Sequence, residues 1–252
     1  MIDQSIIDRL DWAATSASPI GQLSLSVGEE EAYALQAALV ERRLARGERL
    51  VGFKMGLTSL AKMAQVNVNE PIMGKLTDAM EVPDGESLAL GRFIHPRVEP
   101  EIAFCLACDL AGEIDVAAAR AAVAKVAPAI DVLDSRYAAF KFNLADGIAD
   151  NCSSAAFVVG PWSLCPESLG DLPMQIEVDG VIAHEGSSQE ILGDPFNSLV
   201  RAARLAGRHG MVLPAGAIFL TGAATAAVPV SAGTTVRAVV GGLGDCSLRV
   251  VA

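Results

Sequence analysis

The sequence predicts an α+β fold with a rolled, mixed β-sheet preceded by a helical N-terminal lobe. Helical patterns fill the first 47 residues, whereas repeated short strands with one inserted helix fill the C-terminal third. No internal repeat or low-complexity linker divides the 252 residues. We therefore expect a helical lobe over residues 1–47 and one larger domain over residues 48–252.

Composition narrows the class of partner. The formal net charge is −11, which disfavours nucleic acid and anionic membrane as partners. No run approaches the ~18 apolar residues of a transmembrane helix, and the N-terminus shows no signal-peptide core. We expect a cytoplasmic protein whose anionic ligands are attracted by locally placed cations.

The N-terminal lobe is predicted to contain two helices. The first covers residues 2–14. The second begins after a capping-box pattern at residues 26–29 and ends near Arg46, with Gly47 as its stop. Apolar residues at helical spacing give the second helix one buried face.

The next segment, residues 50–59, is predicted to be a strand that carries one lysine, Lys54, between glycines. A lysine with buried neighbours is uncommon unless it has an anionic partner, so Lys54 is a candidate functional residue. A short helix over residues 61–66, a loop over residues 69–78 and a turn over residues 82–85 follow.

Residues 95–104 (HPRVEPEIAF) form the strand on which the functional prediction rests. Side chains alternate along a strand, so Glu99 and Glu101 share one face while Val98 and Ile102 occupy the other. Two carboxylates ~4 Å apart repel by roughly 4 kcal/mol at an effective dielectric near 20. A shared proton, a nearby base or a divalent metal must offset that repulsion, unless the glutamates simply face water.

A third carboxylate lies on a second strand. The helix that starts at Asp115 is predicted to end at Pro128, and the strand that follows places Asp131 between Ile130 and Val132. Three carboxylates on two strands, with no Cys or His nearby in sequence, make a hard-oxygen site suited to Mg²⁺ or Mn²⁺.

The remaining segments complete the α+β pattern. Residues 134–142 mix aromatic and basic side chains and run into the polar residues 150–154, and this segment is interpreted as a substrate wall or lid, although Asp134 and Arg136 could instead pair in a surface loop. Asp194 and Pro195 are the N-cap and first residue of a helix that reaches about Gly210. Strands are predicted over residues 155–159, 174–178, 181–184, 217–220, 235–240 and 246–251, with a hairpin turn at residues 179–180.

Other site chemistries find little support in the sequence. The five scattered cysteines include one C-x2-C pair, Cys105 and Cys108. Their side chains would point to opposite faces of a strand, which disfavours a zinc or redox site. The three histidines are far apart in sequence and are interpreted as structural. No phosphate-binding loop, dinucleotide fingerprint or nucleophile elbow is present.

Taken together, residues 52–59 (GFKMGLTS), 95–104 and 134–154 resemble the hydratase and decarboxylase branch of the fumarylacetoacetate hydrolase superfamily. The resemblance runs from about residue 30 to the end, and Gly193-Asp194-Pro195 and Leu220-Thr221-Gly222 also coincide with family motifs. Residues 75–78 and 137–143 look more like the decarboxylases than the hydratases. The resemblance implies that residues 48–252 form a catalytic domain of this fold.

The resemblance also implies a site. It places an Mg²⁺ or Mn²⁺ ion on Glu99, Glu101 and Asp131, the same residues that the strand pattern selects, although the position of Asp131 ordinarily carries Glu and that of Asp194 often carries His. It implies catalytic roles for Lys54, near the metal, and Lys141, which would steer a distal carboxylate. The expected substrate-binding residues are Leu57, Thr77, Asp78, Arg136 and Thr221.

The implied activity is metal-dependent decarboxylation of a small 2-oxo dicarboxylic acid, 2-oxo-3-hexenedioate, in aromatic catabolism. Three other functions stay open: hydration of 2-hydroxypenta-2,4-dienoate by a 2-keto-4-pentenoate hydratase, acylpyruvate hydrolysis, and a non-catalytic metal-binding partner subunit. A homo-oligomer, in complex with a hydratase partner, is also expected from the resemblance.

Overall fold

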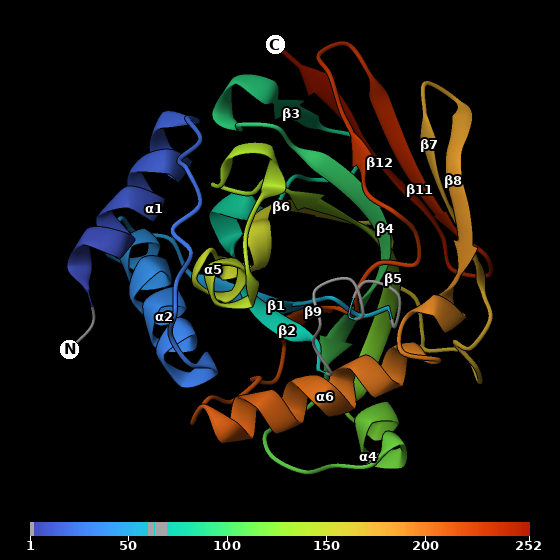
Figure 1. Ribbon diagram of the computed structural model, residues 1–252. Coiled ribbons are helices and arrows are strands. Elements are labelled where there is room, and N and C mark those ends of the chain that lie inside the picture. Colours follow the sequence, from blue (N-terminus) through green and yellow to red (C-terminus); the bar gives the residue numbers. More distant parts are fainter. Residues whose placement is uncertain (1–2, 60–62, 64–69) are drawn as a thin grey trace.

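The computed structural model describes residues 3–59, 63 and 70–252, and Figure 1 shows their arrangement. The helices are α1 (Gln4–Ser16), α2 (Glu29–Ala45), α4 (Val116–Ala121), α5 (Leu144–Ala149) and α6 (Pro195–Arg208). The strands are β1 (Leu50–Gly56), β2 (Ile72–Thr77), β3 (Ser87–Ala89), β4 (Arg97–Leu106), β5 (Val123–Leu133), β6 (Ser154–Val159), β7 (Pro173–Val178), β8 (Val181–Ser187), β9 (Ile218–Leu220), β10 (Val228–Pro229), β11 (Thr235–Val240) and β12 (Gly244–Val251).

These strands form two sheets. The larger sheet has the order β2-β1-β9-β4-β5-β6, with β10 paired to β4, and the smaller has the order β3-β12-β11-β7-β8. Most pairings are antiparallel, but β1 runs parallel to β9 and β12 parallel to β3. In Figure 1 the larger sheet curves around the middle of the molecule, with α1, α2 and α5 on one side and α6 below. This confirms the predicted mixed α+β fold with a rolled sheet.

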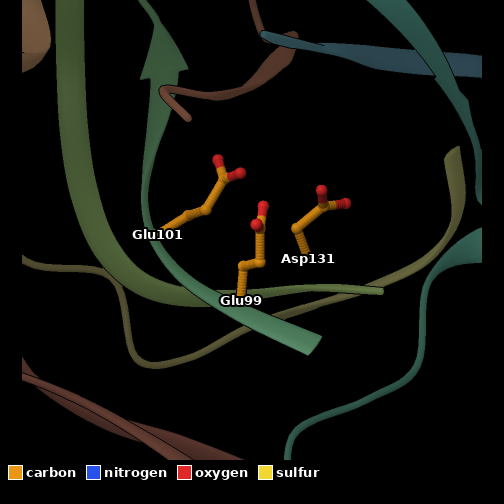
Figure 2. Close-up of side chains that lie close together, drawn as sticks. All are labelled: Glu99, Glu101 and Asp131. Carbon is orange, nitrogen blue, oxygen red and sulfur yellow. The ribbon is translucent and has the colours of Figure 1, made fainter. Parts of the chain in front are cut away.

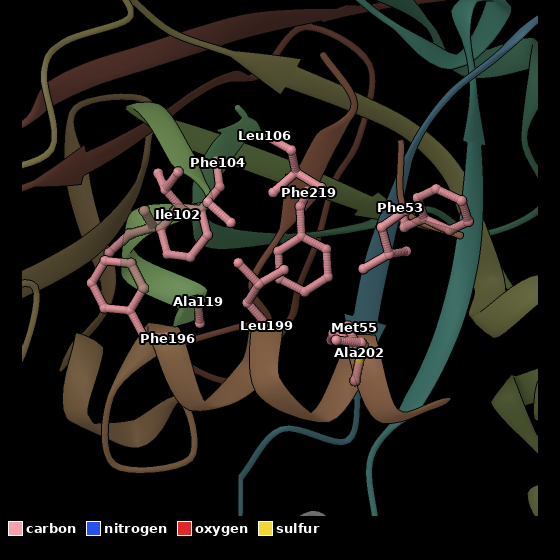
Figure 3. Packing of buried hydrophobic residues seen from close by; sticks show 14 of the residues in the cluster. Phe53, Met55, Ile102, Phe104, Leu106, Ala119, Phe196, Leu199, Ala202 and Phe219 are labelled. Carbon is pink, nitrogen blue, oxygen red and sulfur yellow. The ribbon is translucent and has the colours of Figure 1, made fainter. Parts of the chain in front are cut away.

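Two apolar layers hold β4 in place. Toward one end of β4, Val98 packs with Ile130 of β5 and with side chains of the smaller sheet, including Val236 and Leu248. Toward the other end, Phe104 stacks on Phe196 of α6 with ring centroids 5.1 Å apart, as Figure 3 shows. Even-numbered residues of β4 therefore face cores, which forces the odd-numbered residues onto the opposite face.

The two N-terminal helices form as predicted, with small differences at their ends. The Asp3 side chain caps α1 by accepting a hydrogen bond from the N–H of Ser5. The predicted capping box of α2 is wrong, because its N-cap is Gly28, which offers no side-chain oxygen. Gly47 takes a positive φ just after the helix, as expected of a C-terminal stop. The division of the chain into two domains near residue 47 stays a prediction.

Two other local predictions are wrong. Residues 72–77 form β2 rather than a loop, because their backbone pairs with β1 along its length. The helix that begins at Asp115 ends at Ala121, not at Pro128, because the β-branched Val123 and Val126 pair with β4 instead. Apart from Met63, the helix predicted over residues 61–66 lies outside the described residues, as does the first residue of the predicted loop, 69.

Candidate metal centre

The three predicted metal ligands meet on the odd-numbered face of β4. Glu99 lies directly opposite Asp131 of β5, and Glu101 lies two residues further along. Each carboxylate offers one oxygen such that the three oxygens all lie within 4.8 Å of one another. The exposed fractions are 6%, 1% and 0% for Glu99, Glu101 and Asp131. Figure 2 shows the three side chains pointing to the same side of the two strands, so the interpretation in which the glutamates face water is wrong.

The small residues of this face leave space for a long side chain. Across the sheet, Lys54 is in register with Leu220, which is in register with Ala103, so Lys54 occupies the same face as the carboxylates. Ala129 lies opposite Glu101 and adds no bulk. The Lys54 ammonium, 1% exposed, forms an ion pair with the Oδ2 of Asp131.

A turn after β9 supports Glu101. The N–H of Gly222 donates to Glu101 Oε2 at 2.7 Å. The N–H and the hydroxyl of the preceding Thr221 both donate to the carbonyl of Ile102, at 3.1 and 3.0 Å. Gly222 has a φ of +106°, and a Cβ at this position would collide with the Thr58 side chain. Only glycine fits this turn without strain.

Burial and charge shift the proton affinities of these groups. Burial by itself lowers the pKa of Lys54, but Asp131 and Glu101 outweigh it and hold the pKa of Lys54 above its usual value. Burial, together with the negative charge of Asp131, raises the pKa of Glu101 well above its usual value despite the nearby ammonium.

The donor set fits a divalent ion. Among the described residues, the three carboxylates, when ionised, and the Lys54 ammonium carry −3 + 1 = −2 charges, which one divalent cation would balance. All three candidate ligands supply oxygen, the ligand atom preferred by Mg²⁺ and Mn²⁺ over soft metals. The residues that would hold the ion are Glu99, Glu101 and Asp131, with Lys54 beside them.

A cavity adjoins this centre. Its volume is about 150 Å³, comparable with cavities that accept a benzene-sized molecule. Lys54, Glu99, Thr58 and Ser153 supply polar side chains, and the other walls are mainly apolar. Burial raises the pKa of the lining Cys152 to about 12, so its thiol stays neutral. Apolar lining side chains include Leu57, Ile72, Leu133, Phe140, Phe142 and Ala223.

Several predicted site residues gather here and others do not. Leu57 lines the cavity. Thr221 does not line it, but its hydroxyl donates to the carbonyl of Ile102, the residue that follows Glu101 on β4. Lys141 is exposed and does not line the cavity, whereas its neighbours Phe140 and Phe142 do. Of the predicted wall over residues 134–154, Phe140, Phe142, Gly147, Cys152 and Ser153 line the cavity, and a contact of this segment with substrate stays a prediction.

Three further predicted residues are engaged elsewhere. Thr77 is buried and its hydroxyl donates to Glu48, and Asp78 forms an ion pair with Arg49 at 2.8 Å. Arg136 is buried in an ion pair with Asp150. None of these three residues lines the cavity, because each satisfies a charge or hydrogen bond of the surrounding structure.

The surface-loop interpretation of residues 134–136 is wrong. Asp134 is buried and accepts hydrogen bonds from the N–H groups of Ile94 and His95, both at 2.8 Å. The His95 ring lies 4.6 Å from that of Phe140, and its Nε2 is 2.9 Å from the carbonyl oxygen of Ser135, so a structural role for His95 stays a prediction.

Sequence reasoning missed Thr58, Ser153 and Gly222 as site residues. Thr58 lies in the segment that carries Lys54, and Gly222 directly follows Thr221, so each stands beside a predicted site residue. Ser153 has a positive φ, as do Asn151 and Cys152 before it. Such a run of three left-handed residues has no signal in a single sequence, because positive φ is uncommon for residues other than glycine.

A comparison with protein families matches residues 54–251 to the family described as "Fumarylacetoacetate (FAA) hydrolase C-terminal". The chain belongs to the fumarylacetoacetate hydrolase family. This confirms the resemblance seen in the sequence.

Relatives of this family narrow the comparison. A 4-oxalocrotonate decarboxylase from a Pseudomonas species is 47% identical over 244 residues, 96% of this chain and 95% of the relative. A 2-keto-4-pentenoate hydratase from Dechloromonas aromatica is 38% identical over 94% of this chain and 93% of the relative. The solved structure of 4-oxalocrotonate decarboxylase from Pseudomonas putida G7, complexed with magnesium and adipate, superposes with a TM-score of 0.95 at 36% identity and covers 98% of this chain and 96% of that one.

A helix that crosses a membrane must be both long and strongly apolar. None of the helices in the described part of the chain meets both requirements.

Proposed function

We propose that this chain decarboxylates 2-oxo-3-hexenedioate (4-oxalocrotonate) to 2-hydroxypenta-2,4-dienoate, using Mg²⁺ or Mn²⁺ held by Glu99, Glu101 and Asp131. The observation that carries the proposal is a buried trio of carboxylates beside Lys54, at the wall of a small cavity. The 47% identity with a 4-oxalocrotonate decarboxylase supports the choice of substrate.

The chemistry needs an electron sink at the 2-oxo end of the substrate. A bound divalent ion would supply Lewis acidity at the 2-keto oxygen. The bond from C5 to the distal carboxyl carbon breaks, and its electron pair moves through the conjugated system to that oxygen while CO₂ leaves. One proton on the oxygen then gives the enol product.

The residues of this chain divide that work. Lys54 carries its charge at Nζ, beside Asp131, where it can stabilise developing negative charge and donate the final proton. Gly222 fixes the carboxylate of Glu101 through its N–H. The apolar walls, including Phe140 and Phe142, would limit the access of water to the dienolate that forms as CO₂ leaves.

A hydratase activity is the second candidate, because 2-keto-4-pentenoate hydratases are also relatives over nearly the whole chain. The two activities separate in one assay with purified protein and Mg²⁺. Decarboxylation releases CO₂ from 2-oxo-3-hexenedioate and forms the dienoate, whereas hydration consumes the dienoate absorbance without CO₂. Turnover of the dienoate alone would overturn the decarboxylase proposal.

Acylpyruvate hydrolysis and a non-catalytic role lead to different results in the same assay. Acylpyruvate hydrolysis would need a base beside an activated water, and neither His95 nor His209 lines the cavity. A non-catalytic subunit would bind Mg²⁺ yet turn over no 2-oxo acid.

We further propose that the chain acts in the cytoplasm as a homo-oligomer associated with a hydratase. Light scattering of the protein alone, and of the protein mixed with the hydratase, would test both kinds of assembly.

A further inference from the structure

The proposed substrate carries a second carboxylate that the metal centre cannot hold. The chain as a whole is acidic, with a net charge of −11, so the distal carboxylate needs a local cation. Among the described residues that line the cavity, Lys54 is the one cationic side chain. It is already paired with Asp131. Lys141 is exposed and lies outside the lining.

Arg97 is not itself a lining residue, but it adjoins the residues that line the cavity. It lies two residues before Glu99 on the same face of β4, and it is half-buried. Its guanidinium carbon sits 4.1 Å from the centre of the Phe140 ring. Its cross-strand neighbour on β5 is Leu133. Glu99, Phe140 and Leu133 all line the cavity, so three neighbours of Arg97 form part of its wall.

The donors of Arg97 are also available. Within the described residues, its side chain makes no hydrogen bond and no ion pair; the face of Phe140 is its contact. By contrast, Arg136 is fully engaged with Asp150 and the Ser154 carbonyl. A guanidinium presents several N–H donors in a planar fork that matches a carboxylate, and stacking on an aromatic ring leaves that fork free at its edge.

We propose that Arg97 binds the distal carboxylate of the substrate and thereby selects 2-oxo dicarboxylic over 2-oxo monocarboxylic acids. The inference rests on the proposed function. Two residues along a strand span about 7 Å, which is comparable to the length of an extended six-carbon diacid whose other end lies at Glu99. Phe140 contacts both His95 and Arg97, and its ring face positions the guanidinium.

This role predicts which kinetic constant changes. The distal carboxylate is the group that leaves as neutral CO₂, so a cation stabilises it more before the bond breaks than during the reaction. Loss of Arg97 therefore raises KM for the diacid without lowering kcat. A residue that only supported the fold would not produce that split.

The test compares two ligands that share the metal-binding end. Binding of 2-oxoadipate and of 2-oxohexanoate is measured by calorimetry with Mg²⁺ for the wild type, Arg97→Met and Arg120→Met. Arg120 is a matched control, because its guanidinium also stacks on a phenylalanine, Phe196, at 4.3 Å. We expect Arg97→Met to weaken 2-oxoadipate binding about tenfold or more and to leave 2-oxohexanoate within about twofold, with Arg120→Met like the wild type.

Other results would overturn the inference. The role of Arg97 would be contradicted if Arg97→Met weakened the binding of both ligands equally. It would also be contradicted if Lys141→Gln, but not Arg97→Met, lost the preference for 2-oxoadipate over 2-oxohexanoate. If Arg97→Met does not fold, Arg97→Lys replaces it and is expected to reduce the preference several-fold by losing the fork; an unchanged preference would contradict the inference. If the wild type binds neither ligand in an Mg²⁺-dependent way, the proposed function falls and the inference with it.

Discussion

Glu99 and Asp131 lie directly opposite each other on the antiparallel strands β4 and β5. A single pairing register thus brings together two of the three carboxylates, and the alternation of β4 adds Glu101. Because the register is fixed by buried side chains on the other face, the trio is built into the sheet rather than into loops. A conservative change of one ligand should then alter metal binding without altering the fold.

Removing one carboxylate should abolish the activity and leave the fold intact. Glu101→Gln keeps the shape of the side chain and an acceptor for the N–H of Gly222, but it removes a ligand charge. We expect kcat/KM to fall at least about 100-fold, with unchanged circular dichroism and a thermal midpoint at or above that of the metal-free wild type. Glu113→Gln, whose side chain is 71% exposed, is the control. Full activity of Glu101→Gln would remove the metal assignment.

Metal affinity should rise with pH. Burial and the charge of Asp131 raise the pKa of Glu101 well above its usual value, so the metal-free native state keeps a proton that the unfolded chain releases. Metal-free stability therefore falls as pH increases from the usual glutamate range toward the raised pKa, and a bound ion must displace the proton. Calorimetry in buffers of different ionisation enthalpy should detect proton release. An affinity that stays constant between about pH 5 and 8 would contradict this.

Lys54 and Asp131 should be coupled in stability. Lys54→Met leaves a buried carboxylate without its ammonium, and we expect the metal-free protein to lose about 3 kcal/mol of unfolding free energy. In the double variant Lys54→Met/Asp131→Asn, much of that loss should be recovered, because the carboxylate that lost the Lys54 ammonium is gone. Denaturant unfolding of all four proteins gives the coupling energy. Additive losses would show that the two groups act independently.

Arg136 offers a contrast between a structural and a substrate-binding role. Because its guanidinium is buried against Asp150, Arg136→Met should cost about 3–5 kcal/mol of stability and leave the 2-oxo acid affinity of the folded protein unchanged. Arg237→Met, which breaks a largely exposed pair with Asp245, should cost no more than about 1 kcal/mol. If Arg136→Met weakens 2-oxo acid binding without loss of stability, its predicted role as a substrate-binding residue stands.

The metal ligands were predictable because their signal is local. The alternation of β4 is visible in the sequence, and Asp131 stands out between apolar neighbours. The sequence did not predict the register that places Asp131 opposite Glu99. That register follows once β4 and β5 both bury their apolar faces. The family resemblance identified the same trio independently.

The rest of the site depends on distant partners. Lys141 carries a charge of the right sign, yet the chain turns so that its aromatic neighbours face the cavity. Thr77 and Asp78 find partners in Glu48 and Arg49, residues that precede β1. Such contacts join segments about 29 residues apart. The spacing of apolar residues along a helix or strand does not predict them.

The same reason explains the missed strand. Residues 72–77 contain Gly74 and follow Pro71, which is typical of a loop. In the structure Gly74 is needed because a Cβ there would press on the carbonyl of Asn151, at 2.8 Å, beside the left-handed turn of residues 151–153. The glycine marks a close approach within a strand, and only the folded chain distinguishes that from a turn.

The central claim is that Glu99, Glu101 and Asp131 hold one divalent ion that binds the 2-oxo acid end of the substrate. The most direct measurement is a crystal structure of the protein with Mn²⁺ and oxalate, with the ion located by anomalous scattering. We predict one strong anomalous peak within coordinating distance of all three carboxylates, with oxalate bound to the ion on its cavity side. A peak elsewhere, or no peak at this trio at saturating Mn²⁺, would contradict the account.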